Sequence, residues 1–310
     1  MISVGVDVNQ AKNDDGSTPL HIACHKGHIE EVTTLLAENA DVNQAANDGI
    51  TPLYAACHNG HIEVVATLLA ENADVNQAAY DGTTPLYAAC GGNGRAEVVA
   101  TLLAENADVN QAANDGTTPL YVACENGDLG VVQLLSSYGA SRIFTDTDDN
   151  LLEAPYDTAE HLAIEQGHHE TAAWLVTSRH WSLLHHLEFI TTERALELLR
   201  DGVSTDAAAP GDLTPLDRAK ELCNSGAADA GSAAHVVLEW GAPWSRETHK
   251  FYPPKVRARV AALMRVAQAI KRGKAAYEAD GVYVSFASPA AVADVFESCV
   301  IPHDIASDVW

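Results

Sequence analysis

The sequence predicts an all-α solenoid built from stacked helical repeats, and three observations predict it. The thirteen residues TLLAENADVNQAA occur three times without a change, at 34–46, 67–79 and 101–113. The triplet Thr-Pro-Leu begins at residues 18, 51, 84 and 118, so that one repeat is 33 or 34 residues long. Within each repeat, apolar residues recur at spacings of three and four, which indicates pairs of short amphipathic helices.

Each repeat opens with a tight turn and a capped first helix. Asp48-Gly49 is a dipeptide that favours tight turns. Thr51 is a suitable N-cap, and Pro52 suits the first helical position because it needs no backbone N–H there. We therefore expect a short helix that begins at Pro52 and ends at Gly60.

A second helix follows directly in each repeat. Glu63 lies near its start, where a negative charge suits the helix dipole. Val64 and Leu68 belong to its apolar stripe. Asn72 follows this helix, and we expect it to end the helix in the left-handed conformation, which Asn adopts more readily than most residues.

This order of turn, helix, tight turn and helix resembles the ankyrin-repeat family. The stretches TPLHIACHKGHIEEVTTLL and TPLYAACHNGHIEVVATLLAENADVN carry the resemblance, which covers four regular repeats. The departures are an Asn in place of the usual Gly and a Tyr in place of the usual His, at Asn39, Asn72 and Asn106 and at Tyr54, Tyr87 and Tyr121. The resemblance implies an ankyrin-repeat solenoid that binds another protein, has no enzymatic activity and needs no cofactor.

Less regular repeats follow the regular ones. We expect residues 1–178 to hold a partial first repeat, four regular repeats and one degenerate repeat, which begins at Thr158. Residues 179–245 resemble further degenerate repeats: Leu198 lies in one predicted second helix, and Thr214 opens the last repeat. The chain begins inside a repeat, because residues 5–10 match residues 39–44. We favour truncation of a longer chain as the reason, but fraying of this end or packing of another element on it are alternatives.

The composition changes in the C-terminal segment, residues 246–310, which we expect to be helical. Half of the chain's 18 basic residues lie between 246 and 274, and Glu247 is the only acidic residue there. A predicted helix after Pro254 has one apolar face and is otherwise basic. Two interpretations stay open: a helix that caps the last repeat, which we favour, or a basic amphipathic element that binds a partner helix, an acidic protein or an anionic surface.

A short motif near the end supports an alternative function. Residues 301–305, IPHDI, faintly resemble the opening of an F-box, a motif that recruits ubiquitin-ligase subunits. The alternative is a substrate-recruiting adaptor, in which the repeats hold a target and the C-terminal segment recruits the ligase.

Charge is unevenly distributed along the chain. Residues 1–178 contain 26 acidic and 4 basic residues, a balance of −22, whereas residues 179–310 have a balance of −3. The acidic part repels phosphate backbones, so we expect no nucleic acid as a partner. It favours a basic protein surface, or it serves only to keep the chain soluble. No apolar stretch approaches the length of a membrane span.

Four of the six cysteines recur at one position of the repeat, as Cys24, Cys57, Cys90 and Cys124. Neighbouring repeats lie about 10 Å apart, which is too far for a disulfide. No CxxC pair suggests zinc. We interpret these cysteines as small buried residues in a reducing compartment, and expect a monomer in the cytoplasm or the nucleus.

No motif for catalysis or metal binding occurs. A Walker loop, GxSxG and HExxH are all absent from the sequence. The glycine-rich GGNGR at 91–95 is interpreted as a one-residue insertion in the turn between two helices. We therefore expect no catalytic residue and no metal site.

Candidate binding residues follow from the ankyrin resemblance, which implies that a partner lies against the turn tips and the inner face of the first helices. The tip positions are Asp14, Asp15, Ser17, Asn47, Asp48, Ile50, Tyr80, Asp81, Thr83, Asn114, Asp115 and Thr117. The inner-helix positions are His25, Lys26, His58, Asn59, Gly91, Gly92, Asn93, Glu125 and Asn126.

The aspartates of the tips have two interpretations. Asp before Gly is good turn chemistry, which suffices to explain Asp15, Asp48, Asp81 and Asp115. The stack would also set them in a row at steps of about 10 Å, and an extended peptide advances about 3.3 Å per residue. The row would then favour a partner with a basic residue near every third position. Tyr80 and Ile50 are candidate anchors.

Residues 141–157 replace the fifth turn with a longer finger, in which Arg142, Phe144 and Asp146 are candidates for partner contact. Loss of repeat regularity explains the finger equally well. The family resemblance also makes Asn43, Asn76 and Asn110 possible targets of asparaginyl hydroxylation.

Overall fold

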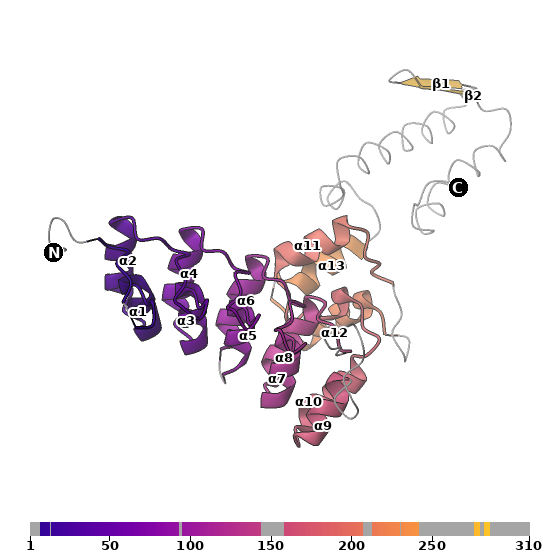
Figure 1. The fold of residues 1–310 in the computed structure, drawn as a ribbon. Helices are drawn as coiled ribbons and strands as arrows, with labels where there is room; N and C mark the ends of the chain where they lie inside the picture. Colours follow the sequence, from indigo (N-terminus) through magenta and orange to yellow (C-terminus); the bar gives the residue numbers. More distant parts are fainter. Residues whose placement is uncertain are drawn as a thin grey trace. The chain divides into compact units, whose positions relative to one another are not determined.

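The computed structural model describes residues 7–12, 14–92, 95–143, 158–206, 213–229, 231–241, 276–279 and 282–285. The chain divides into two compact units, an N-terminal unit of residues 1–190 and a C-terminal unit of residues 191–310. The described residues are mainly helical (Figure 1). Among the described helices, none is long and apolar enough to cross a membrane.

The N-terminal unit is a stack of helix pairs. Its first helices are α1 (Pro19–Lys26), α3 (Pro52–Asn59), α5 (Pro85–Cys90), α7 (Pro119–Asn126) and α9 (Ala159–Glu165). Its second helices are α2 (Ile29–Ala37), α4 (Ile62–Ala70), α6 (Ala96–Ala104), α8 (Leu129–Ser137) and α10 (His169–Thr177), and a short 3-10 helix η1 (Leu183–His185) follows them. Each first helix packs on the next first helix, so that α1, α3 and α5 form one row and α2, α4 and α6 a second (Figure 1).

The first helices begin and end as the sequence predicts. The Thr51 hydroxyl oxygen accepts the N–H of Tyr54 at 3.1 Å. The same bond recurs at the start of the other first helices of this unit, at Thr18, Thr84, Thr118 and Thr158. Gly60 ends α3 in the left-handed conformation with φ of 75°. These caps satisfy backbone groups that a helix end leaves without a partner.

In the identical segments, an Asn lies two residues after the end of each second helix. Asn39, Asn72 and Asn106 have φ of 62°, 61° and 63°, and among the described residues they alone combine a positive φ with a side chain. The prediction that Asn replaces the usual Gly as the left-handed residue is confirmed. The N–H of the residue after Asn72, Ala73, then reaches back to the carbonyl of Leu68 at 3.0 Å.

The core runs the length of the stack as columns of equivalent residues. Leu20, Leu53, Leu86 and Leu120 form one column, and each is at most 1% exposed. The cysteine column lies in the same core, and its thiols are free and buried. Burial raises the pKa of the Cys24 thiol to about 12. The prediction that these cysteines act as small buried residues is confirmed for Cys24, Cys57, Cys90 and Cys124.

Asparagine side chains tie consecutive repeats together. The Oδ1 atom of Asn43 accepts the N–H of Asp74 at 2.8 Å. The same bond, also at 2.8 Å, joins Asn9 to Asp41, Asn76 to Asp108 and Asn110 to Ser141. The perfect repetition of the DVN sequence therefore has a structural cause, because each copy has the same hydrogen bond to make.

The C-terminal unit contains α11 (Thr192–Arg200), α12 (Pro215–Ser225) and α13 (Ala233–Gly241). Both α11 and α12 pack on α13. These helices lie where the sequence predicts parts of two degenerate repeats. Residues 226–232 connect α12 to α13.

Two strands form an antiparallel hairpin within residues 246–310, a segment that we expected to be helical. Strand β1 (Ala276–Ala279) pairs with β2 (Val282–Ser285), with Tyr277 opposite Val284. The physical reason lies in the residues. Strand β2 contains the strand-forming run Val-Tyr-Val, and Asp-Gly, a dipeptide that two-residue hairpins favour, stands between the strands. The predicted capping helix after Pro254 and the IPHDI motif lie outside the described residues.

Candidate functional site

Each turn tip is held by its own aspartate. The Oδ1 atom of Asp48 accepts the N–H of Ile50 at 3.0 Å. Asp15, Asp81 and Asp115 make the same bond to the residue two positions on, at 2.9–3.0 Å. Turn chemistry therefore accounts for one oxygen of each carboxylate. All four side chains remain exposed.

Hydrogen bonds favour the charged form of two of the tip carboxylates. The N–H of Ser17 lowers the pKa of Asp15, and the hydroxyl of Thr83 lowers the pKa of Asp81. The hydrogen bond to the backbone also holds each of the four carboxylates in place at its tip.

Backbone hydrogen bonds join the tips into a continuous row. The N–H of Asn47 donates to the carbonyl of Asp15 at 2.9 Å, that of Tyr80 to Asp48 at 3.0 Å, and that of Asn114 to Asp81 at 2.8 Å. We call the four tips at residues 14–17, 47–50, 80–83 and 114–117 the tip row. Its carboxylates therefore lie one repeat apart.

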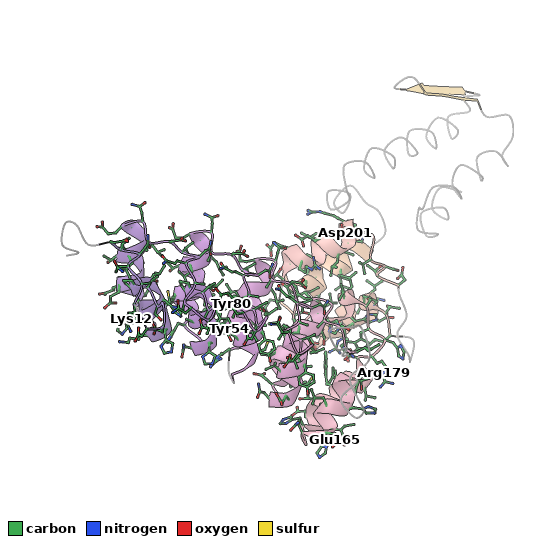
Figure 2. All side chains as sticks on the ribbon, viewed as in Figure 1. Lys12, Tyr54, Tyr80, Glu165, Arg179 and Asp201 are labelled. Carbon is green, nitrogen blue, oxygen red and sulfur yellow. The ribbon has the colours of Figure 1, made fainter. Side chains whose placement is uncertain are left out.

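Tyr80 breaks the pattern of the tip row. Its counterpart Asn114 lays its side chain on the preceding tip, with Nδ2 donating to the Tyr80 carbonyl at 2.8 Å. The Tyr80 side chain, which Figure 2 labels, is 76% exposed. Its ring lies against Gly49 of the preceding tip. Of the two predicted anchors, Tyr80 is therefore exposed, whereas Ile50 is half-buried.

A polar chain links the tips to the first helices. The Thr83 hydroxyl lies 3.3 Å from the Tyr54 hydroxyl and donates to Asp81 Oδ1 at 2.6 Å. Tyr87 and Thr117 repeat the contact at 3.2 Å in the next repeat. Thr83 is only 8% exposed. The expectation that Thr83 contacts a partner needs correction, since its hydroxyl is used within the protein to orient Asp81.

The side chains of the predicted inner-helix residues differ in their exposure and in the hydrogen bonds that they make. The side chains of His25, Lys26 and His58 are exposed. Asn59 instead donates to the Ala55 carbonyl of its own helix at 2.8 Å. Asn126 donates to the Cys90 carbonyl of the preceding repeat at 3.2 Å, and so joins two repeats.

The remaining inner-helix positions are less regular. Glu125 and Gly91 are exposed, and Gly92 is half-buried. Gly91 ends α5 with φ of −72°, unlike the left-handed Gly27 and Gly60 of the first two repeats, because the turn carries an extra residue. Asn93 lies outside the described residues.

Comparison with protein families decides the family. A family model described as ankyrin repeats in three copies matches residues 1–79, 74–146 and 94–183, which together exceed half of the chain. The chain belongs to the ankyrin-repeat family. Ankyrin repeats are generally protein–protein interaction modules, and the family is typically non-enzymatic. A search of curated proteins found no match.

Arg142, in the finger after the fourth ankyrin repeat, makes contacts within the protein. Its guanidinium donates to the Leu175 carbonyl at 2.8 Å and to Ser178 Oγ at 3.0 Å, and it lies over the Trp174 ring at 5.5 Å. Its side chain therefore holds the end of the stack together, and a partner contact at Arg142 stays a prediction. Phe144 and Asp146 lie outside the described residues.

Sequence reasoning missed two features of the ankyrin surface. The tyrosine hydroxyls that reach the tips could have been suspected, because Tyr54 and Tyr87 stand where the family usually has His. Arg95 occupies the place of His61 in the next repeat, lies against Gly60 and donates to the Ala88 carbonyl at 3.2 Å.

Among the described residues, no His, Cys, Asp or Glu side chains are grouped in threes to hold a metal ion.

Proposed function

We propose that the ankyrin stack is a scaffold that binds an extended basic segment of a partner protein along the tip row and the neighbouring inner-helix residues. The observation that carries this proposal is the row of backbone-anchored, exposed carboxylates at Asp15, Asp48, Asp81 and Asp115. The balance of −22 over residues 1–178 would attract a basic segment from a distance.

The spacing of the row defines the partner. Consecutive tips are one repeat apart, about 10 Å, and an extended chain covers that distance in about three residues. A partner with Lys or Arg near every third position can therefore place one charge against each tip. Each exposed pair contributes little alone, about 0.3–0.5 kcal/mol, so that affinity depends on all four acting together.

Tyr80 supplies the centre of the proposed surface. It lies between Asp48 and Asp81, and aromatic residues are enriched among those that dominate binding energy. An exposed ring can also attract a basic side chain through its face. The Tyr80 tip therefore combines apolar area with charge on both sides.

The test is a titration of the full chain with a labelled peptide that carries Lys at every third position among Gly, Ser and Thr. The variant replaces Asp15, Asp48, Asp81 and Asp115 with Asn, whose side-chain oxygen can still accept the turn hydrogen bond. We expect binding about tenfold weaker, from four pairs of a few tenths of a kcal/mol each, and a smaller dependence on salt.

A matched control removes the same charge elsewhere. It replaces four exposed glutamates of the second helices with Gln, at Glu30, Glu38, Glu71 and Glu105. The proposal expects this control to bind close to the unchanged protein. Equal weakening in both variants would show that only total charge matters, and the proposed surface would be rejected.

A second candidate function rests on the basic composition of residues 246–274. In that adaptor, the ankyrin stack holds a target and the C-terminal segment recruits another protein, for example a ubiquitin-ligase subunit. Pull-downs with residues 1–245 and with residues 246–310 separate the candidates. Distinct partner sets support the adaptor, whereas partners on the first piece alone support the scaffold. Insolubility of the first piece supports a capping role for the segment.

Hydroxylation of Asn43, Asn76 and Asn110 stays a prediction from the family. The amide oxygen of each side chain already accepts a hydrogen bond from the next repeat, at 2.8 Å. Mass spectrometry of protein purified from its own cells checks the prediction, which requires one added oxygen atom on a peptide that contains one of these residues.

A further inference from the structure

The spacing of the tip row limits the conformation in which a basic segment can bind along it. A β-strand advances about 3.3 Å per residue and turns successive side chains to opposite sides, so that residues three apart face opposite ways. Basic side chains on one side of a strand are therefore about 6.6 Å or about 13 Å apart, and neither distance matches the repeat of about 10 Å. A strand cannot place one charge against every tip.

A polyproline II helix fits the same spacing. It has about three residues per turn and rises about 3.1 Å per residue, so that every third side chain lies on one face at steps of about 9.3 Å. Over the steps between four tips, the difference from the repeat adds up to about 2 Å. The flexible stem of a Lys side chain can absorb a difference of that size.

The tips keep their spacing where the length of the repeat changes. The third and fourth Thr-Pro-Leu triplets are 34 residues apart instead of 33, because the turn between α5 and α6 carries an extra residue. The N–H of Asn114 nevertheless donates to the Asp81 carbonyl at 2.8 Å, just as the N–H of Tyr80 donates to the Asp48 carbonyl at 3.0 Å. The tip row therefore continues without a break through the irregular repeat.

The backbone of the tips already makes hydrogen bonds within the ankyrin stack. In the second tip, the N–H groups of Asn47, Gly49 and Ile50 all donate within the protein, and the carbonyl groups of Asp48 and Ile50 accept backbone N–H groups. The third tip repeats these bonds. A strand that adds to an edge needs free N–H and C=O groups there, whereas a polyproline II helix makes no such backbone bonds. The tips therefore suit a polyproline II segment better than an added strand.

Aromatic rings lie beside the third and fourth tips. The Tyr54 hydroxyl lies 3.3 Å from the Thr83 hydroxyl, and the Tyr87 hydroxyl lies 3.2 Å from the Thr117 hydroxyl. Both tyrosines are half-buried, so part of each side chain remains accessible beside the tips. Surfaces lined by aromatic side chains recognise Pro-rich segments, because such segments already have the polyproline II conformation before they bind.

The rings and the carboxylates are close to one another. Burial is the main cause that raises the pKa of the Tyr87 phenol, and the negative charges of Asp115 and Glu125 raise it further. The Tyr87 side chain is therefore neutral at neutral pH and lies near two carboxylates. A segment that places a basic residue against Asp115 has its next residues beside this ring.

We propose that the partner segment binds the tip row as a polyproline II helix, with Lys or Arg at every third position and Pro between them. This proposal rests on the proposed function, because it specifies the segment that the tip row binds. One face of the helix carries basic side chains toward the carboxylates, and a second face carries prolines toward Tyr54 and Tyr87. Proline suits this second face, because it packs on aromatic side chains and needs no partner for a backbone N–H.

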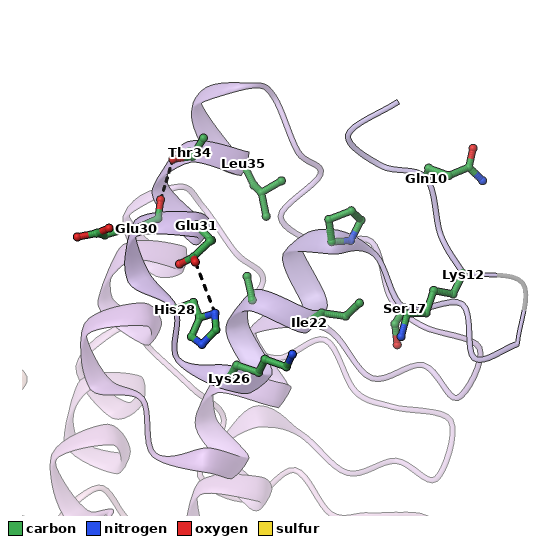
Figure 3. A pocket seen from close by; sticks show the side chains of 12 residues that line it. Gln10, Lys12, Ser17, Ile22, Lys26, His28, Glu30, Glu31, Thr34 and Leu35 are labelled. Carbon is green, nitrogen blue, oxygen red and sulfur yellow. Dashed lines mark hydrogen bonds and ion pairs between the residues drawn. The ribbon is translucent and has the colours of Figure 1, made fainter. Parts of the chain in front are cut away.

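The first tip differs from the other three, because a basic residue lies beside it. The N–H of Lys12 donates to the Ser17 carbonyl at 3.0 Å, and both residues line a hollow of about 750 Å³ in the first repeat (Figure 3). The N–H of Ser17 is the main cause of the lowered pKa of Asp15, and the positive charge of Lys12 adds to it. The segment should therefore bind mainly along the second, third and fourth tips.

The experiment is a titration of the full chain with three labelled peptides, each of which carries four lysines. The first peptide has Lys at every third position and Pro at the other positions. The second has the same Lys positions among Gly, Ser and Thr. The third keeps the prolines but has Lys at every fourth position, which turns successive lysines by about 120° and spreads them over all faces of the helix.

The proposal expects the first peptide to bind about tenfold more tightly than the second, because its prolines leave less conformational freedom to lose on binding. The third peptide should bind several-fold more weakly than the first, although both have the same charge and are equally stiff. Binding of the first peptide that is no tighter than that of the second or the third overturns the proposal.

The same titrations separate the failure of this proposal from the failure of the proposed function. The variant with Asn at the four tip aspartates and the control with Gln at four glutamates are both titrated. If the aspartate variant binds the second peptide more weakly than the control does, but the first peptide has no advantage, only the polyproline II conformation is rejected. If the two variants are weakened equally for all peptides, both proposals fall.

Tyr87 provides a second test, whose readout is the ratio of two affinities and does not follow stability. Tyr87→Leu removes the aromatic ring, whereas Tyr87→Phe keeps the ring and removes only the hydroxyl. The Leu variant should lose affinity for the first peptide several-fold and keep most of its affinity for the second, and the Phe variant should keep the original ratio. Thermal unfolding shows that each variant is folded. An unchanged ratio in the Leu variant overturns the placement of prolines against this ring.

Single exchanges test where the segment lies along the tip row. Asp15→Asn should weaken binding of the first peptide less than Asp81→Asn does, because Lys12 already lies beside the first tip. A larger loss of affinity at Asp15 than at Asp81 overturns the placement along the last three tips.

Discussion

Single residues at the helix ends determine much of the regular structure of the ankyrin stack. Asn72 ends α4 at φ of 61°, a conformation that strains most side chains, because Cβ approaches the following carbonyl oxygen. Asn tolerates it better than other residues with a side chain, and Gly avoids it. The sequence alone predicts this conformation, since the position follows a periodic helix and the family usually has Gly there.

Substitutions of Asn72 test the role of its backbone conformation. Asn72→Ala should lower the free energy of unfolding by about 1 kcal/mol, because Ala pays the full cost of the left-handed conformation. Asn72→Gly should leave stability within a few tenths of a kcal/mol or raise it. Urea unfolding followed by circular dichroism measures both. Equal stability of the Ala and Gly variants would contradict the role given to φ at this position.

The predicted site residues differ in exposure, and their role in binding stays a prediction. Tyr80 is exposed, and its place just after an identical repeated segment was the available signal for choosing it. Thr83 was not predicted to be buried, because its burial depends on the Tyr54 hydroxyl of the repeat before it. Contacts between repeats are not visible in the pattern of a single repeat.

At the scale of elements, an aromatic cluster ends the N-terminal unit. Trp181 lies 5.3 Å from His186 and 6.0 Å from His185 between ring centroids, and Trp174 lies 5.7 Å from His186. Both histidines are at most 2% exposed. Burial, together with the positive charge of Arg142, lowers the pKa of His186 to about 3. This side chain is therefore neutral in the folded protein at neutral pH.

A pH dependence follows from this shift. An unfolded His has an ordinary pKa of about 6.5. Between that value and about 3, the unfolded chain binds a proton at His186 and the folded chain does not. Stability should therefore fall with decreasing pH across this window, by about 1.4 kcal/mol per pH unit from this one group. Above pH 6.5 the group adds no pH dependence.

The measurement is urea unfolding of the full chain between pH 4 and pH 7, with His186→Phe as the variant and His180→Gln as the control. Phe keeps an aromatic ring in the cluster and cannot bind a proton. We expect a shallower loss of stability at acid pH in the Phe variant. The control should behave like the unchanged chain, because His180 is exposed. Parallel curves for all three proteins would reject the assignment.

Element prediction was best where the repeats are regular. The helices from α1 to α8 follow from the Thr-Pro caps and the apolar stripes, because each repeat contains the residues that begin and end its own helices. The hairpin of β1 and β2 was missed, since its eight paired residues were expected to be helical with the rest of 246–310. The run Val282-Tyr283-Val284 directly after Asp280-Gly281 was the signal available.

At the scale of the whole molecule, the distribution of acidic residues allows two surfaces to attract a basic partner. One is the tip row. The other is formed by exposed acidic residues at and just after the ends of the second helices, which are Glu38, Asp41, Glu71, Asp74, Glu105 and Asp108. The charge balance of the sequence does not show which of these two surfaces binds the partner. Backbone hydrogen bonds fix carboxylates in both surfaces, for example Asp48 in the tip row and Asp74 in the other. The tip row is favoured because its carboxylates flank an exposed aromatic residue, Tyr80.

The most direct test of the proposed function is carbodiimide cross-linking of the full chain to the peptide with Lys at every third position, followed by mass spectrometry of the joined fragments. The reagent bonds a lysine to a carboxylate only where the two are in contact. The proposal predicts cross-links at Asp48 and Asp81, and fewer when Tyr80 is replaced by Asn, the residue of the neighbouring tips. Cross-links confined to Glu38, Glu71 and Glu105 would contradict it.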